Sequence, residues 1–142
     1  MSQNFANHAK VVPQFHFFVG PALILNVVWT AVRLVRHLSL ENGELFLVAV
    51  ALLLLAFNAR LFALRVQDRI IRLEMRMRMK ELLPTDLQPR IEEFSLGQLI
   101  SLRFASDAEL PTLARKVLDE RINDRKVIKK MVQNWQADEL RA

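Results

Sequence analysis

The chain contains no cysteine and no tyrosine, and it has only three glycines and five prolines among its 142 residues. Without cysteine, disulfides, thiolate metal sites and a cysteine nucleophile are all excluded. The glycines, at positions 20, 43 and 97, lie too far apart to form a glycine-rich phosphate-binding loop. These absences remove several classes of redox, metal-binding and nucleotide-binding protein.

Charge is nearly absent from the first part of the chain. Residues 1–59 have a net charge of +1, whereas the remaining residues carry 17 basic and 13 acidic groups. Between Lys10 and Arg33 lie 22 residues without Asp, Glu, Lys or Arg. As a helix, such a segment covers the roughly 30 Å hydrocarbon core of a bilayer. We therefore predict a transmembrane helix over residues 13–35, following an N-terminal segment of residues 1–12, and we expect Gly20-Pro21 to disturb it.

A second apolar run begins at Leu45 and reaches spanning length if it continues to Leu64, with Arg60 extended toward the headgroups. The sequence thus predicts a second transmembrane helix over residues 45–64. The connection, residues 36–44, contains the turn signal Asn42-Gly43 and is predicted to be a short external loop. The alternative is a soluble hairpin with a buried core, but the rest of the chain has too little apolar surface to enclose two such helices.

The distribution of basic residues predicts the orientation of this helical hairpin. Two arginines border the connection, whereas seven basic residues follow the second span by position 80. Because basic residues concentrate on the cytoplasmic side, both termini are predicted to be cytoplasmic. Asn26 and Asn58 lie within or near the apolar segments, where we expect interhelical polar contacts or bonds to backbone carbonyls.

Residues 65–83 are predicted to continue the second membrane helix into the cytoplasm and to end before Pro84. The helix has an arginine face and two apolar stripes. The arginine face contains Arg65, Arg69, Arg72 and Arg76. The first stripe contains Phe62, Val66, Ile70, Leu73 and Met77, and the second contains Leu64, Ile71, Met75 and Leu82. Neither stripe keeps heptads over three or four repeats, so we expect later helices of the chain to cover both.

The arginines have two interpretations. In one, the arginine face and Arg60 contact anionic lipid headgroups, at about 1 kcal/mol per residue near the surface. In the other, which we favour, these arginines are solvated and only fix the orientation of the spans.

Residues 84–142 are predicted to form a cytoplasmic region of three short amphipathic helices. Ser95 and Gln98 have capping-box spacing and predict a helix from about 96 to 105. Ser106 and Glu109 repeat that signal, although Pro111 alternatively marks the first turn of the next helix. The apolar side of that helix is predicted to contain Leu110, Leu113, Ala114, Val117 and Leu118. The last helix presents a face that packs against this cap or against a partner; it consists of Val127, Ile128, Met131, Val132 and Trp135.

The fold predicted from these patterns is an all-α membrane protein, a two-span hairpin whose second helix continues into a capped cytoplasmic extension. The sequence offers few candidates for a catalytic or metal site. Its three histidines, at positions 8, 16 and 37, lack the spacing of metal ligands and have no carboxylate cluster beside them. We predict no enzyme, metal or cofactor. Nucleic acid is not an expected partner, because residues 90–142 are almost balanced, with ten basic and nine acidic groups.

Four stretches of the sequence together resemble a family of small bacterial membrane proteins of unknown function. They are "NHAKVVPQFHFF", "LRVQDRIIRLEMRMR", "LISLRFASDAELP" and "IKKMVQNWQAD". The resemblance implies a bacterial inner-membrane protein with two spans and a cytoplasmic helical tail, and it transfers no activity.

From the sequence we predict a non-enzymatic, membrane-anchored interaction protein, an accessory subunit or scaffold of a bacterial inner-membrane complex. Its expected partners are the lipid bilayer and other membrane-protein subunits, or further copies of itself. One alternative is a homo-oligomeric channel or transport element in which Pro21, Asn26 and Asn58 face a central path. Another is an anionic-lipid sensor that acts through the arginine face.

Overall fold

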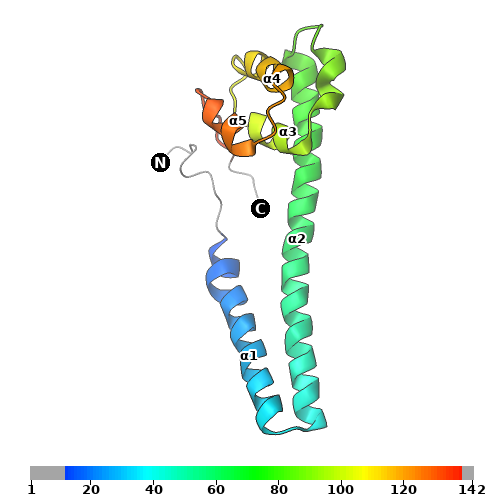
Figure 1. Ribbon diagram of the computed structural model, residues 1–142, viewed down its shortest axis with the longest axis vertical. Helices are drawn as coiled ribbons and strands as arrows, with labels where there is room; N and C mark the ends of the chain where they lie inside the picture. The colour runs from blue at the N-terminus through cyan, green and yellow to red at the C-terminus, as the bar shows by residue number, and fades with distance from the viewer. Residues whose placement is uncertain (1–11, 139–142) are drawn as a thin grey trace. The chain divides into compact units, whose positions relative to one another are not determined.

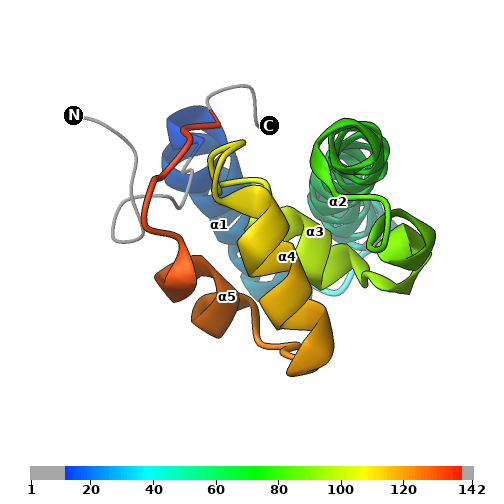
Figure 2. The ribbon, with the colours of Figure 1, turned by 90° about the horizontal axis from the view of Figure 1, so that it is seen from above.

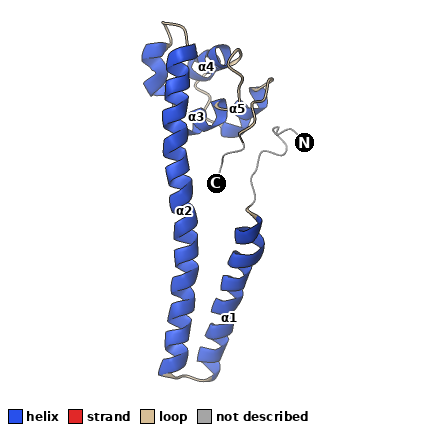
Figure 3. Ribbon diagram, turned by 180° about the vertical axis from the view of Figure 1, so that it is seen from behind, coloured by secondary structure: helices blue, strands red, loops and turns tan. Residues whose placement is uncertain are grey.

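The computed structural model describes residues 12–138, and all regular elements in that range are helices (Figures 1 and 3). They are the π-helix η1 (Gln14–Val19), α1 (Gly20–Arg36), α2 (Leu40–Leu82), the 3-10 helix η2 (Gln88–Glu93), α3 (Leu96–Leu102), α4 (Leu110–Asp119) and α5 (Arg125–Met131). An isolated β-bridge joins Ala105 to Trp135. The predicted all-helical class is thus confirmed for the described part of the chain.

The long helix α2 contributes to two compact units. The hairpin unit contains η1, α1 and α2 up to Leu64, and the helical unit contains α2 from Arg65 together with the later elements. No break interrupts α2 between the two units. The helix ends at Leu82, before Pro84, as the sequence predicts.

The expected disturbance at Gly20-Pro21 takes the form of a π-helical segment that directly precedes the proline. The backbone N–H of Gly20 donates to the carbonyl of Phe15, five residues earlier. Proline lacks an N–H and its ring clashes with the carbonyl four residues before it in a regular α-helix, which the wider turn relieves. A Cβ on Gly20 would lie 3.1 Å from the Phe15 oxygen, so glycine suits this close approach.

The connection between α1 and α2 is shorter than the predicted loop of residues 36–44. It comprises only residues 37–39, and Asn42-Gly43 lies in the first turn of α2 instead of forming a turn. The Asn42 backbone N–H donates to Ser39 Oγ at 3.2 Å, and Asn42 Nδ2 donates to the His37 carbonyl at 2.7 Å. The asparagine therefore stabilises a helix start, because its side chain binds the backbone that enters the helix.

The helix starts of the helical unit match the sequence signals in part. The capping box is confirmed, since the Gln98 backbone N–H donates to Ser95 Oγ and the Ser95 N–H donates to Gln98 Oε1. α3 nevertheless ends at Leu102 and not at 105. α4 begins at Leu110 without a side-chain cap, with Pro111 in its first turn, so the proline alternative is the right one.

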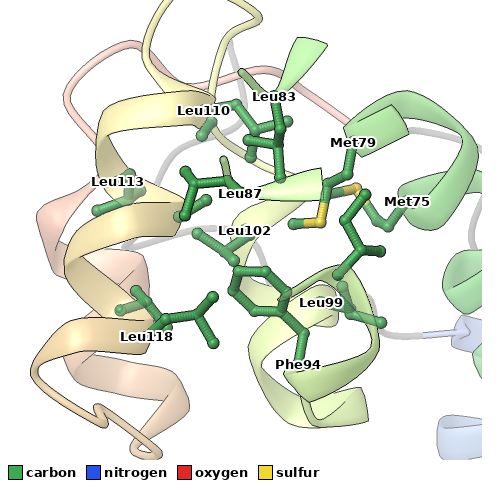
Figure 4. Packing of buried hydrophobic residues seen from close by; sticks show 14 of the residues in the cluster. Met75, Met79, Leu83, Leu87, Phe94, Leu99, Leu102, Leu110, Leu113 and Leu118 are labelled. Carbon is green, nitrogen blue, oxygen red and sulfur yellow. The ribbon is translucent and has the colours of Figure 1, made fainter. Parts of the chain in front are cut away.

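The core of the helical unit forms where side chains from the end of α2, from α3 and from α4 meet (Figure 4). α3, α4 and α5 lie together on one side of the last turns of α2 (Figure 2). The buried cluster consists of Ile71, Met75, Met79, Leu83, Leu87, Ile91, Phe94, Leu99, Leu102, Ala105, Leu110, Leu113, Ala114, Val117, Leu118 and Ile128. The predicted apolar side of α4 is confirmed, because all five of its residues belong to this cluster.

Only one of the two apolar stripes on α2 is covered, which corrects the prediction that later helices cover both. Ile71 and Met75 of the second stripe are buried, and Leu82 packs against the cluster. The first stripe stays exposed from Phe62 to Met77. The three short helices have too few apolar faces to surround α2, and those faces are used on a single side.

Candidate interaction surfaces

Two helices of the structure are long and apolar enough to cross a membrane by length and composition. They are the helix of residues 14–36, which joins η1 to α1, and α2. Their large apolar side chains point outward in the hairpin unit: Leu25 is 68% exposed, Trp29 66% and Leu55 65%. Contiguous apolar surface of this kind marks a site of contact with another molecule or with a membrane.

The residues buried in the hairpin unit are small or polar. They are Thr30, Asn42 and Ala49. Thr30 Oγ1 donates to the Asn26 carbonyl at 2.8 Å, a bond within α1. Asn58 Nδ2 donates to the Leu54 carbonyl at 2.8 Å, a bond within α2. Of the two expected arrangements, Asn58 thus shows the bond to a backbone carbonyl. The Asn26 side chain is exposed.

The arginine face of α2 is divided between solvent and protein. Arg65, Arg69 and Arg72 are exposed, whereas Arg76 forms an ion pair with Glu92 of η2. Arg60 is only half-buried, in the hairpin unit. Of the five arginines predicted to contact headgroups, Arg76 is thus used to hold η2 against α2.

Arg78 connects α2 to the rest of the helical unit, and sequence reasoning missed it. Its Nε donates to Asp107 Oδ1 at 2.8 Å, and Nη1 donates to the Arg103 carbonyl at 3.2 Å. Nη2 donates to the Ala105 carbonyl at 2.6 Å and to Gln136 Oε1 at 2.9 Å. A signal was present, because Arg78 follows the buried Met75 by three residues and thus lies on the covered side of the helix.

The C-terminal segment returns to pack on the loop after α3. The rings of Phe104 and Trp135 stack with centroids 4.4 Å apart, and Lys129 Nζ lies 5.4 Å from the Phe104 centroid. The Gln136 N–H donates to the Phe104 carbonyl at 2.7 Å, and the Ser106 N–H donates to the Asn134 carbonyl at 3.1 Å. This backbone pairing fixes Trp135 over a fully buried ring.

The predicted partner face of the last helix is mostly used within the unit. α5 ends at Met131, so Val132 and Trp135 lie beyond the helix. Ile128 is buried, Met131 and Val132 pack against the core cluster, and only Val127 remains exposed, at 43%. The structure therefore favours the cap-packing interpretation of these residues.

Ion pairs join the segment after α2 to α4. Arg115 of α4 lies 2.7 Å from Asp86, and its guanidinium lowers the pKa of that carboxyl below the ordinary value. Arg90 of η2 lies 2.8 Å from Asp119 and also contacts Glu93. These carboxylates, Asp119 first, raise the pKa of Arg90. The acidic side chains here act in salt bridges.

A hollow between α4 and α5 is lined by a further acidic side chain, Glu109, together with Lys116 and Lys130. Glu109 accepts hydrogen bonds from the backbone N–H groups of Gln133, at 2.8 Å, and Asn134, at 3.0 Å. This carboxylate therefore fixes the chain after α5. Within residues 12–138, no group of three or more His, Cys, Asp or Glu side chains is arranged to hold a metal ion.

A family model matches the whole chain. It is described as "Family of unknown function (DUF6526)" and matches residues 1–142. Neither a curated protein nor a solved structure matches the chain significantly.

Proposed function

We propose that this chain, which belongs to the family of unknown function DUF6526, is a non-enzymatic, membrane-anchored interaction protein. In this proposal it is an accessory subunit or scaffold of a membrane complex. One observation carries it: the hairpin unit exposes its apolar side chains, whereas the helical unit at the end of the same α2 buries a core of its own.

The membrane anchor is supported by the length of the helices and by the direction of their side chains. Residues 14–36 form 23 helical residues, about 34 Å at 1.5 Å per residue, which suits a hydrocarbon core of roughly 30 Å. A soluble protein rarely leaves so many large apolar side chains in water. In a bilayer, these outward-facing side chains meet lipid tails.

The proposed orientation has both termini in the cytoplasm of a bacterium, with the anchor in its inner membrane. Its support is the excess of basic residues after the second apolar segment over those beside the connection. The bacterial source rests on the resemblance described above. The helical unit is then the cytoplasmic part that other subunits contact.

The non-enzymatic assignment is supported by how acidic side chains are used. Glu92 and Asp119 are held by arginines, and Glu109 accepts two backbone N–H groups. Such carboxylates are committed to holding the fold. A scaffold needs a rigid module with exposed faces, and the capped helices of this unit provide one.

The first test is topology, for which the absence of cysteine is useful. Leu38→Cys places a thiol in the connection, where Leu38 is 89% exposed, and Lys116→Cys places one on the exposed side of α4. A membrane-impermeant maleimide should label Leu38→Cys in spheroplasts, and Lys116→Cys only after lysis. Labelling of both before lysis would refute the proposed orientation, and recovery of the protein in the soluble fraction would refute the anchor.

The second test is composition of the assembly. We would purify the tagged full-length chain in mild detergent and determine its subunits by native mass spectrometry. The proposal expects a stoichiometric complex with another membrane protein or with further copies of this chain. A monomer without any partner would contradict the role of subunit or scaffold.

Contact with anionic lipid is a second candidate, because Arg65, Arg69 and Arg72 are all exposed on one side of α2. Replacing all three with Gln should lower the amount of anionic lipid that co-purifies with the protein. Replacing Arg115, which is paired with Asp86, is the control and should leave it unchanged. No loss in the triple variant would leave these arginines as determinants of orientation only. The channel alternative has weaker support, since Asn58 bonds to a carbonyl of its own helix.

A further inference from the structure

No element within residues 12–138 covers one apolar face of α2 in the helical unit. We call it the uncovered face; it consists of Val66, Ile70, Leu73 and Met77, which are 56%, 50%, 61% and 57% exposed. The opposite side of the same helix is buried, with Met75 at 3% and Met79 at 0%. Four half-exposed, large apolar residues in a row on one helix face are typical of a helix–helix contact.

The spacing of this face fits a short two-stranded coiled coil. The residues are separated by four, three and four positions, which assigns Ile70 and Met77 to a and Val66 and Leu73 to d. The central pair, Ile70 at a and Leu73 at d, is the combination that favours two strands in a parallel coiled coil. The seam covers only about two heptads, which is short for helices in free solution.

The charges beside the uncovered face select a second copy as its occupant. Arg69 and Glu74 are both exposed and lie on opposite flanks, at positions g and e. In a parallel dimer, g of one helix meets the e position five residues further along the other helix. Arg69 then lies beside Glu74 of the partner subunit. Within one helix, residues five apart do not face each other, so Arg69 and Glu74 do not pair with each other in the same chain.

The following pair of flanking charges has the same relation. Arg76 and Glu81 are again g and e, five residues apart. Arg76 already contacts Glu92 in its own chain, so the pair formed by Arg69 is the informative one. An anionic lipid surface fits this face less well, because Glu74 and Glu81 flank it along its length.

We propose that two copies of this chain associate in parallel through the uncovered face of α2. Ile70 and Leu73 lie at the centre of this interface, and Arg69 pairs with Glu74 of the partner subunit. The inference rests on the proposed function in one respect: anchoring in a common membrane aligns the two helices in the same direction and confines them, which compensates for the short seam.

Disulfide scanning of the full-length protein in native membranes tests this interface, since the chain has no other cysteine. Single cysteines at positions 66, 70, 73 and 77 should give oxidised dimers. Arg72→Cys, exposed but off the face, is the matched control and should give little dimer. The proposal would be overturned if Arg72→Cys gave as much dimer as the four positions on the face, or if no position gave any dimer. Dimers at a single position would indicate antiparallel helices and would overturn it as well.

Charge reversal tests the flanking pair, with Leu73→Cys as the reporter. Arg69→Glu and Glu74→Arg should each lower the dimer yield by about five-fold, because two equivalent pairs are lost in a symmetric dimer. The double variant should restore the yield. Lack of restoration would overturn the parallel pairing. A negative result here would count against the dimer and not against the membrane anchor, because the labelling of Leu38→Cys tests the anchor separately.

Discussion

The two units of this molecule use leucine in opposite ways. In the hairpin unit Leu54 is 56% exposed and Leu55 is 65% exposed, whereas in the helical unit Leu99 and Leu102 are fully buried. Among its described residues, the hairpin unit buries only Thr30, Asn42 and Ala49. A unit that faces water must bury its apolar residues, but a unit surrounded by lipid gains nothing from hiding them. The difference is the one expected if the hairpin unit is the membrane anchor proposed above and the helical unit faces water.

The contrast continues around α2 within the helical unit itself. Met75 and Met79 are buried on one side, and Leu73 and Met77 are exposed on the other. These four residues are close together in sequence and similar in hydrophobicity. Their environment is decided by which side the short helices cover, so apolar character alone does not define a core.

The largest expected effect comes from matched leucine truncations in the two units. Leu102→Ala should lower the free energy of unfolding of the helical unit by about 2–5 kcal/mol, because it leaves a cavity in a close-packed core. Leu54→Ala should leave that free energy unchanged. The chain has two tryptophans, so Trp29→Phe leaves Trp135 as a fluorescent reporter of the helical unit. Unfolding is then followed in detergent.

Equal destabilisation by both variants would contradict the division into units with separate cores. A negligible effect of Leu102→Ala would show that the cluster around α3 does not limit the stability of the helical unit.

Arg78→Gln should have the next largest effect. The side chain is 20% exposed and donates to four acceptors in two segments, the loop after α3 and the segment after α5. Its loss leaves the Arg103 and Ala105 carbonyls without this donor, and we expect destabilisation by about 2–4 kcal/mol. Arg72→Gln is the control, since Arg72 is exposed on the same helix. If both substitutions lowered the melting temperature alike, general loss of charge and not this network would explain the change.

Local signals in the sequence predict the local structure of the helical unit well. The capping box at Ser95 and Gln98 is present, and so is the apolar side of α4. These features depend on hydrogen bonds and side-chain periodicity within a few residues. The start of α2 was predicted less well, because Asn42-Gly43 is compatible with a turn and with a helix start. Ser39 and His37 select the helix by binding Asn42.

Tertiary contacts were harder to predict. The periodicity of α2 shows two apolar stripes, but it does not give the total apolar area of the later helices, which decides how many stripes they can cover. Trp135 was assigned to a helical stripe, although the chain leaves the helix at Val132 and brings the indole onto Phe104. The sequence identifies Arg78 only as a basic residue, since its partners come from segments 25 or more residues away.

A smaller, stabilising effect is expected at the end of α4. Arg121 has a φ of 51°, and the Ile122 N–H donates to the Val117 carbonyl in a Schellman motif. Because glycine adopts this left-handed conformation without steric cost, Arg121→Gly should raise the free energy of unfolding by about 1 kcal/mol. Arg121→Ala keeps the Cβ and should show no such gain. A gain of equal size in both variants would attribute the effect to the charge.

The smallest effect concerns the pH dependence of the helical unit. Arg115 lowers the pKa of Asp86 below its ordinary value of 3.8. The pair therefore contributes stability above that pH, and the contribution is lost as the pH falls through the lowered pKa. Asp86→Asn should slightly destabilise the unit at neutral pH and match the wild type in strong acid. Arg115→Gln should reproduce this profile, and high salt should weaken it, because Asp86 is exposed. A difference that persisted unchanged into strong acid would mean that Asp86 stabilises the unit without its charge.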